Sequence, residues 1–571
     1  MPPFMSNLAR PAAIKAMGAI AVVFANSATA ASSGPEVFLA RSASSSADVF
    51  GDVERVLGSD LRKRAEERVG QFENIMRPVF MSLPQTEDGR LSAAGARYLL
   101  HRTFVARNSW FVRGLEDDGR SWNTSAPADG GLGLPFGAVP AKVFQERFAR
   151  GMTLGEVAAL AATVEGLVSE EQVDRLHAVY RANGIPESDG PAARTSDEEA
   201  ERVIDGFMVT YVLAQEHEKL TPAVMSQLWR KIEKYPHWAA TQAWVRDVRR
   251  DVVNAAMGPR NAFSTTALVV EELMRRYGRW QNRECDAIKK DLVHLEFEGT
   301  GRVLLHDFYR SALRGQSLFT EDKAYLRDLG ALDESDASKP SVLIANYVNA
   351  PANCLAETKF FSVCCINECD SLLGAVERGV AAPDALPGQI LEIAEGLPSP
   401  TVSAPRVLPA AMVERLEAIA AQHNGRVPLH GRLFAQWMHH AYPRECPFPH
   451  VSGTTMPMRG QEWHERTGAQ YLANRSMLWR HVEQLAPAAA LAAMRTTESE
   501  LREPFSALPW THEEELPLHP AAAARSGLRE FGRCAALFAA ALSLIAVLRH
   551  AADAAIANAG AKAKKWEAHS A

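Results

Sequence analysis

Residues with side-chain or backbone oxygens recur at short, regular spacing in the segment from Glu296 to Asp307. The candidate ligands are Glu296, Glu298, Thr300, the backbone carbonyl of Arg302, and Asp307. Carboxylate, hydroxyl and carbonyl oxygens are the ligands that a hard cation such as Ca²⁺ prefers. Gly301 follows Thr300, at a point where a tight loop needs a residue that tolerates a positive φ. These residue types at this spacing predict a calcium site.

The segment lies between two stretches with the periodicity of amphipathic helices. The apolar positions before it are Leu273, Tyr277, Trp280, Ile288, Leu292 and Leu295, and those after it are Leu305, Phe308, Tyr309 and Leu313. Counted from Glu296, Gly301 is at position 6, Val303 at position 8 and Asp307 at position 12. The segment therefore resembles the EF-hand superfamily, and the resemblance covers only about thirty residues of the chain. It implies a helix-loop-helix that binds calcium.

Two departures from the EF-hand pattern weaken the expected calcium site. Glu296 stands at position 1, where the pattern has Asp, and its side chain is one methylene longer. Asp307 replaces the Glu that coordinates through both oxygens at position 12. The resemblance consequently predicts the helix-loop-helix shape more strongly than it predicts a bound metal.

Two further turns repeat the central residues of this loop. Asn424–Val427 matches Thr300–Val303 almost residue for residue, and Asp88–Leu91 is a fainter copy. In the register of Glu296, positions 1 and 12 are Ala420 and Gly431 in the first copy, and Pro84 and Gly95 in the second. Neither copy has carboxylates at its ends, so both are expected to be ligand-poor partners, since EF-hands usually work in pairs. The alternative is that Gly-Arg turns recur between helices by chance.

The chain has seven cysteines, at positions 285, 354, 364, 365, 369, 446 and 534. Cys534 opens a late apolar segment, which leaves six that allow fifteen pairings, so no pairing is assigned. Disulfides and buried thiols are both compatible with these positions. Four of the cysteines cluster between Cys354 and Cys369, but without the Cys-x-x-Cys spacing of zinc sites.

Histidines gather around Cys446, in the segment from His439 to His450. Adjacent residues such as His439 and His440 point about 100° apart on a helix, so only one would face a shared metal site, to which His430 could also contribute. An enzyme hypothesis is a Cys/His hydrolase, with Cys446 or Cys354 as nucleophile and a nearby histidine as base. The chain lacks the signatures of zincins, phosphate loops, serine hydrolases and dinucleotide-binding folds.

The first 30 residues have the features of a secretory signal peptide. Arg10 and Lys15 precede an apolar run, Ala16–Ala25, which is followed by the small-residue cleavage pattern Ala28–Ala30. An organelle transit peptide is the alternative, because Ala40–Ala47 is rich in Ser and Ala. We therefore expect the protein to enter the secretory pathway and to be lumenal, extracellular or secreted.

A second apolar segment, Cys534–Leu548, lies between two arginines near the C-terminus. As a helix it would rise about 22 Å, which is short of the roughly 30 Å hydrocarbon core, so a core helix is one interpretation. Flanking arginines that reach the interface, and a basic tail over 551–571, favour a membrane helix over 531–550. We therefore predict a single-pass anchor.

Length and composition set the expected architecture. A chain of 571 residues predicts two to four domains. With 47% hydrophobic and 23% charged residues and a net charge of −6, the chain is expected to fold and to have no nucleic-acid partner. Breaks rich in Gly and Pro fall at 126–140, 183–193 and 396–409. Helical regions are therefore expected over 48–190, 191–390 and 400–500, in a mainly α, multidomain protein.

Two blocks, Leu343–Cys369 and Tyr442–His450, are similar to microalgal proteins, a resemblance that implies no activity. The sequence as a whole predicts a membrane-tethered binding or scaffold protein with EF-hand-like units, calcium as the candidate ligand and an unidentified protein partner. The Cys/His hydrolase is the alternative.

Overall fold

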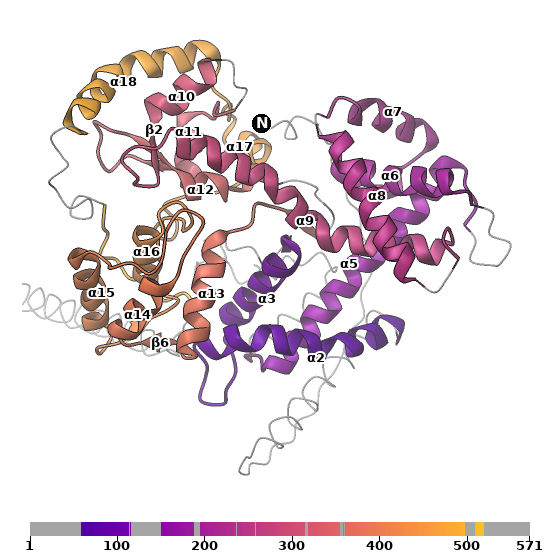
Figure 1. The fold of residues 1–571 in the computed structure, drawn as a ribbon, viewed down its shortest axis with the longest axis horizontal. Helices are drawn as coiled ribbons and strands as arrows, with labels where there is room; N and C mark the ends of the chain where they lie inside the picture. Colours follow the sequence, from indigo (N-terminus) through magenta and orange to yellow (C-terminus); the bar gives the residue numbers. More distant parts are fainter. Residues whose placement is uncertain are drawn as a thin grey trace, which may run out of the picture. The chain divides into compact units, whose positions relative to one another are not determined.

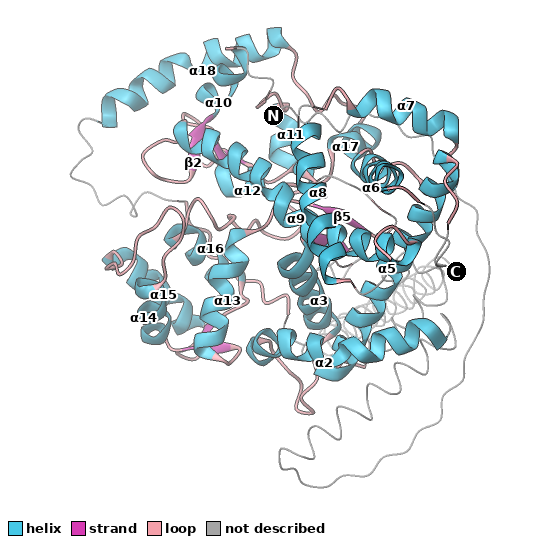
Figure 2. Cartoon of the chain, turned by 45° about the vertical axis from the view of Figure 1, so that its right-hand side comes forward, coloured by secondary structure: helices cyan, strands magenta, loops and turns pink. Residues whose placement is uncertain are grey.

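The computed structural model describes residues 59–112, 115, 150–187, 195–235, 237–256, 259–314, 318–354, 358, 360–496 and 509–518. The expected signal peptide, the candidate membrane helix and the basic tail lie outside these residues. Within them the chain is mainly α-helical, as the periodicity predicted, and its strands are short (Figure 2). No helix in the described part is long and apolar enough to cross a membrane.

The helices and strands follow one another in three groups along the chain (Figure 1). The first group is α2 (Ser59–Ser82), α3 (Ala93–Asn108), β1 (Trp110–Val112), α5 (Leu154–Asn183), α6 (Asp197–Val212), η1 (His217–Lys219), α7 (Pro222–Ile232), α8 (Trp238–Ala255) and α9 (Phe263–His294). The second is β2 (Arg302–Leu304), α10 (Leu305–Leu313), α11 (Lys323–Asp328), β3 (Leu332–Asp333), β4 (Ser341–Leu343), α12 (Ile344–Val348), η2 (Pro351–Asn353) and β5 (Phe361–Val363). The third is α13 (Glu368–Val380), β6 (Asp384–Ala385), α14 (Pro387–Gly396), α15 (Ala410–Gln422), β7 (Val427–Pro428), α16 (Arg432–Ala441), α17 (Gly460–Thr467) and α18 (Arg475–Thr496).

Local sequence explains where several helices begin and end. α5 starts with a capping box in which Thr153 and Glu156 satisfy each other's backbone amides, and it ends at Gly184, whose φ is +66°. α6 starts with the same arrangement of Ser196 and Glu199. The break predicted over 183–193 falls between these two helices, and the break over 396–409 falls between α14 and α15.

The described residues form three hydrophobic clusters. The first contains Phe104 of α3, Phe207 of α6 and Tyr277 of α9, and the second contains Leu292 of α9 with residues of α10, α11, α12, α17 and α18. The third is built from α13 to α16 around Trp437. The long helix α9 contributes one end to the first cluster and the other end to the second (Figure 1). The region expected over 191–390 therefore shares its side chains among all three clusters.

Three disulfides join six cysteines: Cys285–Cys365, Cys354–Cys364 and Cys369–Cys446. These are the six for which the sequence left both the pairing and the oxidation state open, and Cys534 lies outside the described residues. The first bond links α9 to the residues after β5, and the third links α13 to the turn after α16. Disulfides of this kind are typical of oxidising compartments.

Three helix-turn-helix units contain the repeated Gly-Arg sequence, and we call them Gly-Arg units. They are α2 with α3, α9 with α10, and α15 with α16. The glycine has a φ of +71° in the first unit, +73° in the second and +84° in the third. Two residues later an apolar residue joins an antiparallel bridge: Leu91 to Met152, Val303 to Val342, and Val427 to Ala385.

The arginine of each Gly-Arg unit forms an ion pair with a carboxylate close to this bridge. The ion pairs are Arg90 with Glu156 at 2.9 Å, Arg302 with Asp333 at 3.0 Å, and Arg426 with Asp384. A helix begins within two residues of each bridged partner: α5, α12 or α14. One backbone bridge therefore ties every Gly-Arg unit to a second helical segment, and the ion pair reaches the same segment in the first and third units but strand β3 in the second.

Candidate functional site

The loop of residues 295–301 connects α9 to β2 and contains three of the predicted calcium ligands. The amide of Phe297 donates to the carbonyl of Arg302 at 2.8 Å, which closes the turn. The hydroxyl of Thr300 donates to the carbonyl of Phe297 at 2.7 Å. The Thr300 hydroxyl and the Arg302 carbonyl, both predicted as ligands, therefore already have hydrogen-bond partners inside the loop.

Glu296, the predicted first ligand, is buried and has two partners. One carboxylate oxygen accepts a hydrogen bond from the amide of Gly301 at 2.6 Å, and the other accepts one from Arg444 Nε at 2.7 Å. The Glu296 side chain is 4% exposed. The hydrogen bond with Glu296 raises the pKa of the Arg444 guanidinium above its ordinary value. A guanidinium thus neutralises the carboxylate that was expected to hold the ion.

Of the two remaining predicted ligands, one is exposed and the other is partly buried. Glu298 is exposed and has a φ of +53°. Asp307 lies in the first turn of α10, with one oxygen 3.0 Å from His306 Nδ1 and 3.5 Å from Arg310. In the part of the chain that the structure describes, no three His, Cys, Asp or Glu residues are placed to hold a metal together. Calcium binding by this loop stays a prediction.

The loop packs against the turn of residues 442–446, which we call the docking turn. A Cβ on Gly301 would lie 2.3 Å from the carbonyl oxygen of Pro443, so only glycine fits there. Arg444 binds Glu296, and Cys446 is bonded to Cys369. These contacts fasten the loop to the docking turn, and the disulfide ties the docking turn to α13 within the third cluster.

Glu445 completes the docking turn as a fully buried carboxylate. It lies 3.6 Å from Lys289 Nζ of α9 and accepts hydrogen bonds from the hydroxyls of Ser399 at 3.0 Å and Thr401 at 2.7 Å. Both the loop and the segment that contains the docking turn were candidates from the sequence, but no pattern joined them. The one available clue was an unusual Glu at loop position 1, which no spacing rule could connect with an arginine so far along the chain.

Two of the three histidines near the docking turn contact the backbone, and the third packs against an aromatic ring. His439 Nδ1 donates to the carbonyl of Cys446 at 2.7 Å, and burial lowers the pKa of His439 well below its ordinary value. Burial also lowers the pKa of His440 to about 3, and its ring stacks on Trp510. His450 Nε2 lies 2.7 Å from the carbonyl of Gly330. These contacts are those of buried structural histidines.

A cavity of about 740 Å³ lies beside this region and is lined by His430, His450, Cys354 and Cys369. The cysteine nucleophile of a hydrolase must be a free thiol that can ionise. Cys354 and Cys446, the two nucleophiles that the sequence offered, are both in disulfides. The Cys/His hydrolase hypothesis therefore has no free thiol at either position.

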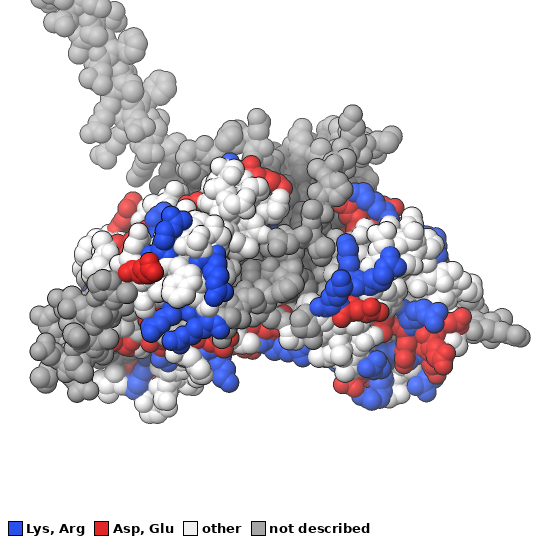
Figure 3. Space-filling model, turned by 90° about the horizontal axis from the view of Figure 1, so that it is seen from above, with Lys and Arg blue, Asp and Glu red and all other residues white. Residues whose placement is uncertain are grey.

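Basic and acidic side chains lie next to one another on the described parts of the face seen in Figure 3.

No protein-family model, curated protein or solved structure matches the chain. Its candidate functions therefore rest on its own geometry.

Proposed function

We propose that this chain is a scaffold protein of the secretory pathway, built from EF-hand-like pairs, in which a guanidinium takes the place of calcium. The observation that carries this proposal is the contact between Arg444 and the buried carboxylate of Glu296. The loop of residues 295–301 then acts as a fixed joint between two clusters of helices and needs no metal.

The three Gly-Arg units support the EF-hand-like interpretation. An EF-hand loop has a glycine at position 6 and an apolar residue at position 8 whose short strand pairs with a second unit. Gly301 and Val303 have these positions, and Val303 is bridged to Val342. Gly89 with Leu91, and Gly425 with Val427, repeat the arrangement, and each has its own paired segment.

Electrostatics favours Arg444 as the cation of the loop. An ionised carboxylate removed from water needs a partner, because its unpaired burial costs several kcal/mol. Glu296 receives one charge-assisted hydrogen bond from Arg444 and another from a backbone amide. For Ca²⁺ to reach Glu296, Arg444 would have to leave, since two cations cannot share this position.

The compartment and the anchor rest on the sequence, with some support from the cysteines. All six cysteines of the described part are paired, which fits the oxidising environment that a signal peptide would deliver the chain to. The membrane helix over 531–550 and the unidentified protein partner remain predictions.

Thermal unfolding of the full chain with a calcium chelator or with millimolar calcium tests this proposal. We expect the wild type to unfold at the same temperature in both conditions. Arg444→Met should lose about 3 kcal/mol of stability, because it leaves Glu296 buried and unpaired. Calcium should restore part of that loss in Arg444→Met but not in the double variant Arg444→Met/Glu296→Gln, which has no carboxylate to bind it.

Arg426→Met is the matched control, since its ion pair with Asp384 is about half exposed at 45% and 44%. Its stability should hardly change and should not respond to calcium. If calcium instead stabilises the wild type to saturation, and Asp307→Ala removes the effect, the loop is a calcium site as the sequence predicted and the proposal is wrong.

A further inference from the structure

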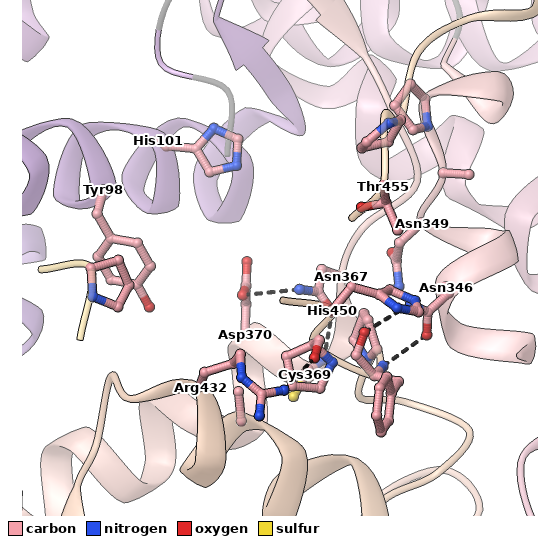
Figure 4. Close-up of a pocket in the computed structure, with 18 of the residues that line it drawn as sticks. Tyr98, His101, Asn346, Asn349, Asn367, Cys369, Asp370, Arg432, His450 and Thr455 are labelled. Atoms are coloured by element: carbon pink, nitrogen blue, oxygen red, sulfur yellow. Dashed lines mark hydrogen bonds between the residues drawn. The ribbon is translucent and has the colours of Figure 1, made fainter. Parts of the chain in front are cut away.

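The cavity of about 740 Å³ has the size of a small-molecule site. Its walls come from α3, α12, α13 and α16 and from the segment 447–459. Figure 4 shows Tyr98 and His101 projecting from α3 on one side, with Asn346, Asn349 and Thr455 on the other side. The disulfides Cys354–Cys364 and Cys369–Cys446 place three sulfur-bearing residues in the lining and hold these walls in position.

The acidic and basic residues of the lining balance one another: Arg102, Arg432 and Arg459 against Asp370, Glu462 and Glu515. Arg102 is buried against Asp370 at 3.6 Å and Glu377 at 3.3 Å. Arg432 donates to the carbonyls of Pro449 and Glu513. With the charges balanced and these two arginines already engaged, the cavity offers no evident counter-charge for an ionic ligand.

Three lining residues have a buried side-chain atom without a hydrogen-bond partner among the described residues: His101 Nδ1, His430 Nδ1 and Asn349 Oδ1. Buried polar atoms are nearly always hydrogen-bonded, so these three residues keep hydrogen-bonding capacity that the protein does not use. The ring of His101 points into the cavity (Figure 4). Burial and the neighbouring Arg102 lower the pKa of His101 to about 4, so the imidazole is neutral at pH 7 and offers one donor and one acceptor.

Aromatic rings supply much of the remaining wall. Tyr98, Phe111, Phe434 and Phe448 all line the cavity. His101 packs edge-on against Phe111, with ring centroids 5.1 Å apart. Rings of this kind bind the apolar body of a ligand, whereas a few polar groups fix its orientation.

We propose that this cavity binds an uncharged, largely apolar organic molecule with an O–H or N–H group that hydrogen-bonds to His101. The site is separate from the loop at Gly301, so it does not depend on the scaffold function proposed above. Its residues come from α3 to the last described segment, and of these the sequence had indicated only His430, His450 and Cys354, as metal-site or hydrolase candidates.

Two fluorescent probes that differ by one sulfonate test both the site and its charge preference. The uncharged N-phenyl-1-naphthylamine and the anionic 1-anilinonaphthalene-8-sulfonate are titrated separately into the oxidised full chain. We expect saturable binding of the uncharged probe at one site and binding of the anion that is weaker by about tenfold or more. His101→Phe keeps an aromatic ring at this position but removes the hydrogen-bonding nitrogens, and it should weaken binding of the uncharged probe by about fivefold.

Two substitutions that fill the cavity from different walls test whether the probe binds there. Leu373→Trp on α13 and Thr455→Trp in the segment after α16 should each weaken the uncharged probe by about tenfold or more. Val407→Trp is the control, because Val407 is 89% exposed and lies outside the lining. Binding of the uncharged probe that does not saturate would overturn the site. The same conclusion would follow if both filling variants bound the probe as tightly as Val407→Trp does. Tighter binding of the sulfonate would overturn the proposed ligand class.

Discussion

The Gly-Arg units at Gly301 and at Gly425 have nearly the same local sequence but different surroundings. Both glycines have a positive φ, and both are followed by a valine in an antiparallel bridge. Gly301 lies directly under Pro443 of the docking turn, whereas a Cβ on Gly425 would meet no atom within 4 Å. The Arg302 side chain is 9% exposed in the first unit, and the Arg426 side chain is 45% exposed in the second.

This difference shows which properties of a turn its own residues determine. The glycine, the arginine and the valine set the backbone path and the bridge at both units. The burial of the turn, and the charge that it meets, depend on whether a distant segment packs over it. The same four-residue pattern is consequently a buried joint at Gly301 and an open surface turn at Gly425.

The largest effect is expected from removing the disulfide that anchors the docking turn. Cys369–Cys446 spans 77 residues and Cys354–Cys364 spans 10. In the chain-entropy model these bonds stabilise by about 4.5 and about 2.7 kcal/mol. Urea denaturation should therefore give a larger loss for Cys369→Ala/Cys446→Ala than for Cys354→Ala/Cys364→Ala. Equal losses would mean that the docking turn is held without its disulfide.

Alanine at the two glycines tests the comparison itself. Gly301→Ala combines an unfavourable φ with a Cβ that would lie 2.3 Å from the Pro443 carbonyl oxygen, so we expect a loss of about 4 kcal/mol. Gly425→Ala has the unfavourable φ alone and should lose about 1 kcal/mol. Denaturation midpoints measure both. Similar losses would show that the docking turn does not press on the loop.

The arginines that cross the bridges should differ in the same direction. Arg302→Met leaves Asp333 beside an apolar chain in a largely buried site and should lose about 2 kcal/mol. Arg426→Met breaks an exposed pair and should lose less than about 1 kcal/mol. High salt should reduce the loss caused by Arg426→Met but not the loss caused by Arg302→Met. A salt-sensitive loss at Arg302 would contradict its burial.

Acid should weaken the packing around His440. The pKa of buried His440 is about 3, below the ordinary value of 6.5, so the unfolded chain takes up its proton first. The stability that neutral His440 provides is therefore complete above about pH 6.5 and is lost as the pH falls toward 3, by up to about 1.4 kcal/mol per pH unit. His440→Phe, which retains a ring against Trp510, should show a smaller loss between pH 7 and 5 in denaturation curves. If His440→Phe loses as much stability between pH 7 and 5 as the wild type does, His440 is not the source of the acid sensitivity.

Sequence patterns predicted the local features of this fold and missed most of the long-range ones. The apolar faces at Tyr211 and Tyr277 lie on helices and are buried, and all three Gly-Arg turns lie between helices. Periodicity and turn chemistry fix these features within a few residues. The pairing of Cys285 with Cys365, and of Arg444 with Glu296, depends on segments far apart in the chain, and no local pattern encodes such a contact.

The cavity was missed for a related reason. His101 and Thr455 lie on opposite walls, and neither belongs to a motif that would indicate a site. The calcium hypothesis, in contrast, came from a motif whose oxygens the structure shows to be largely engaged with other groups. A motif predicts a backbone shape well when the shape is local, but its chemistry depends on what fills the space around it.

A double-mutant cycle of Glu296→Gln and Arg444→Met, measured by urea denaturation in the presence of a calcium chelator, tests the central claim most directly. If Arg444 holds the loop, the two residues should be coupled by about 2 kcal/mol or more in the chelator. Calcium should then reduce this coupling only by the part of the loss that it restores in Arg444→Met, and it should leave the wild type unchanged. A coupling below about 0.5 kcal/mol would show that Arg444 does not hold the loop. A wild type that calcium stabilises to saturation would show that the metal displaces Arg444, and that the loop is a calcium site.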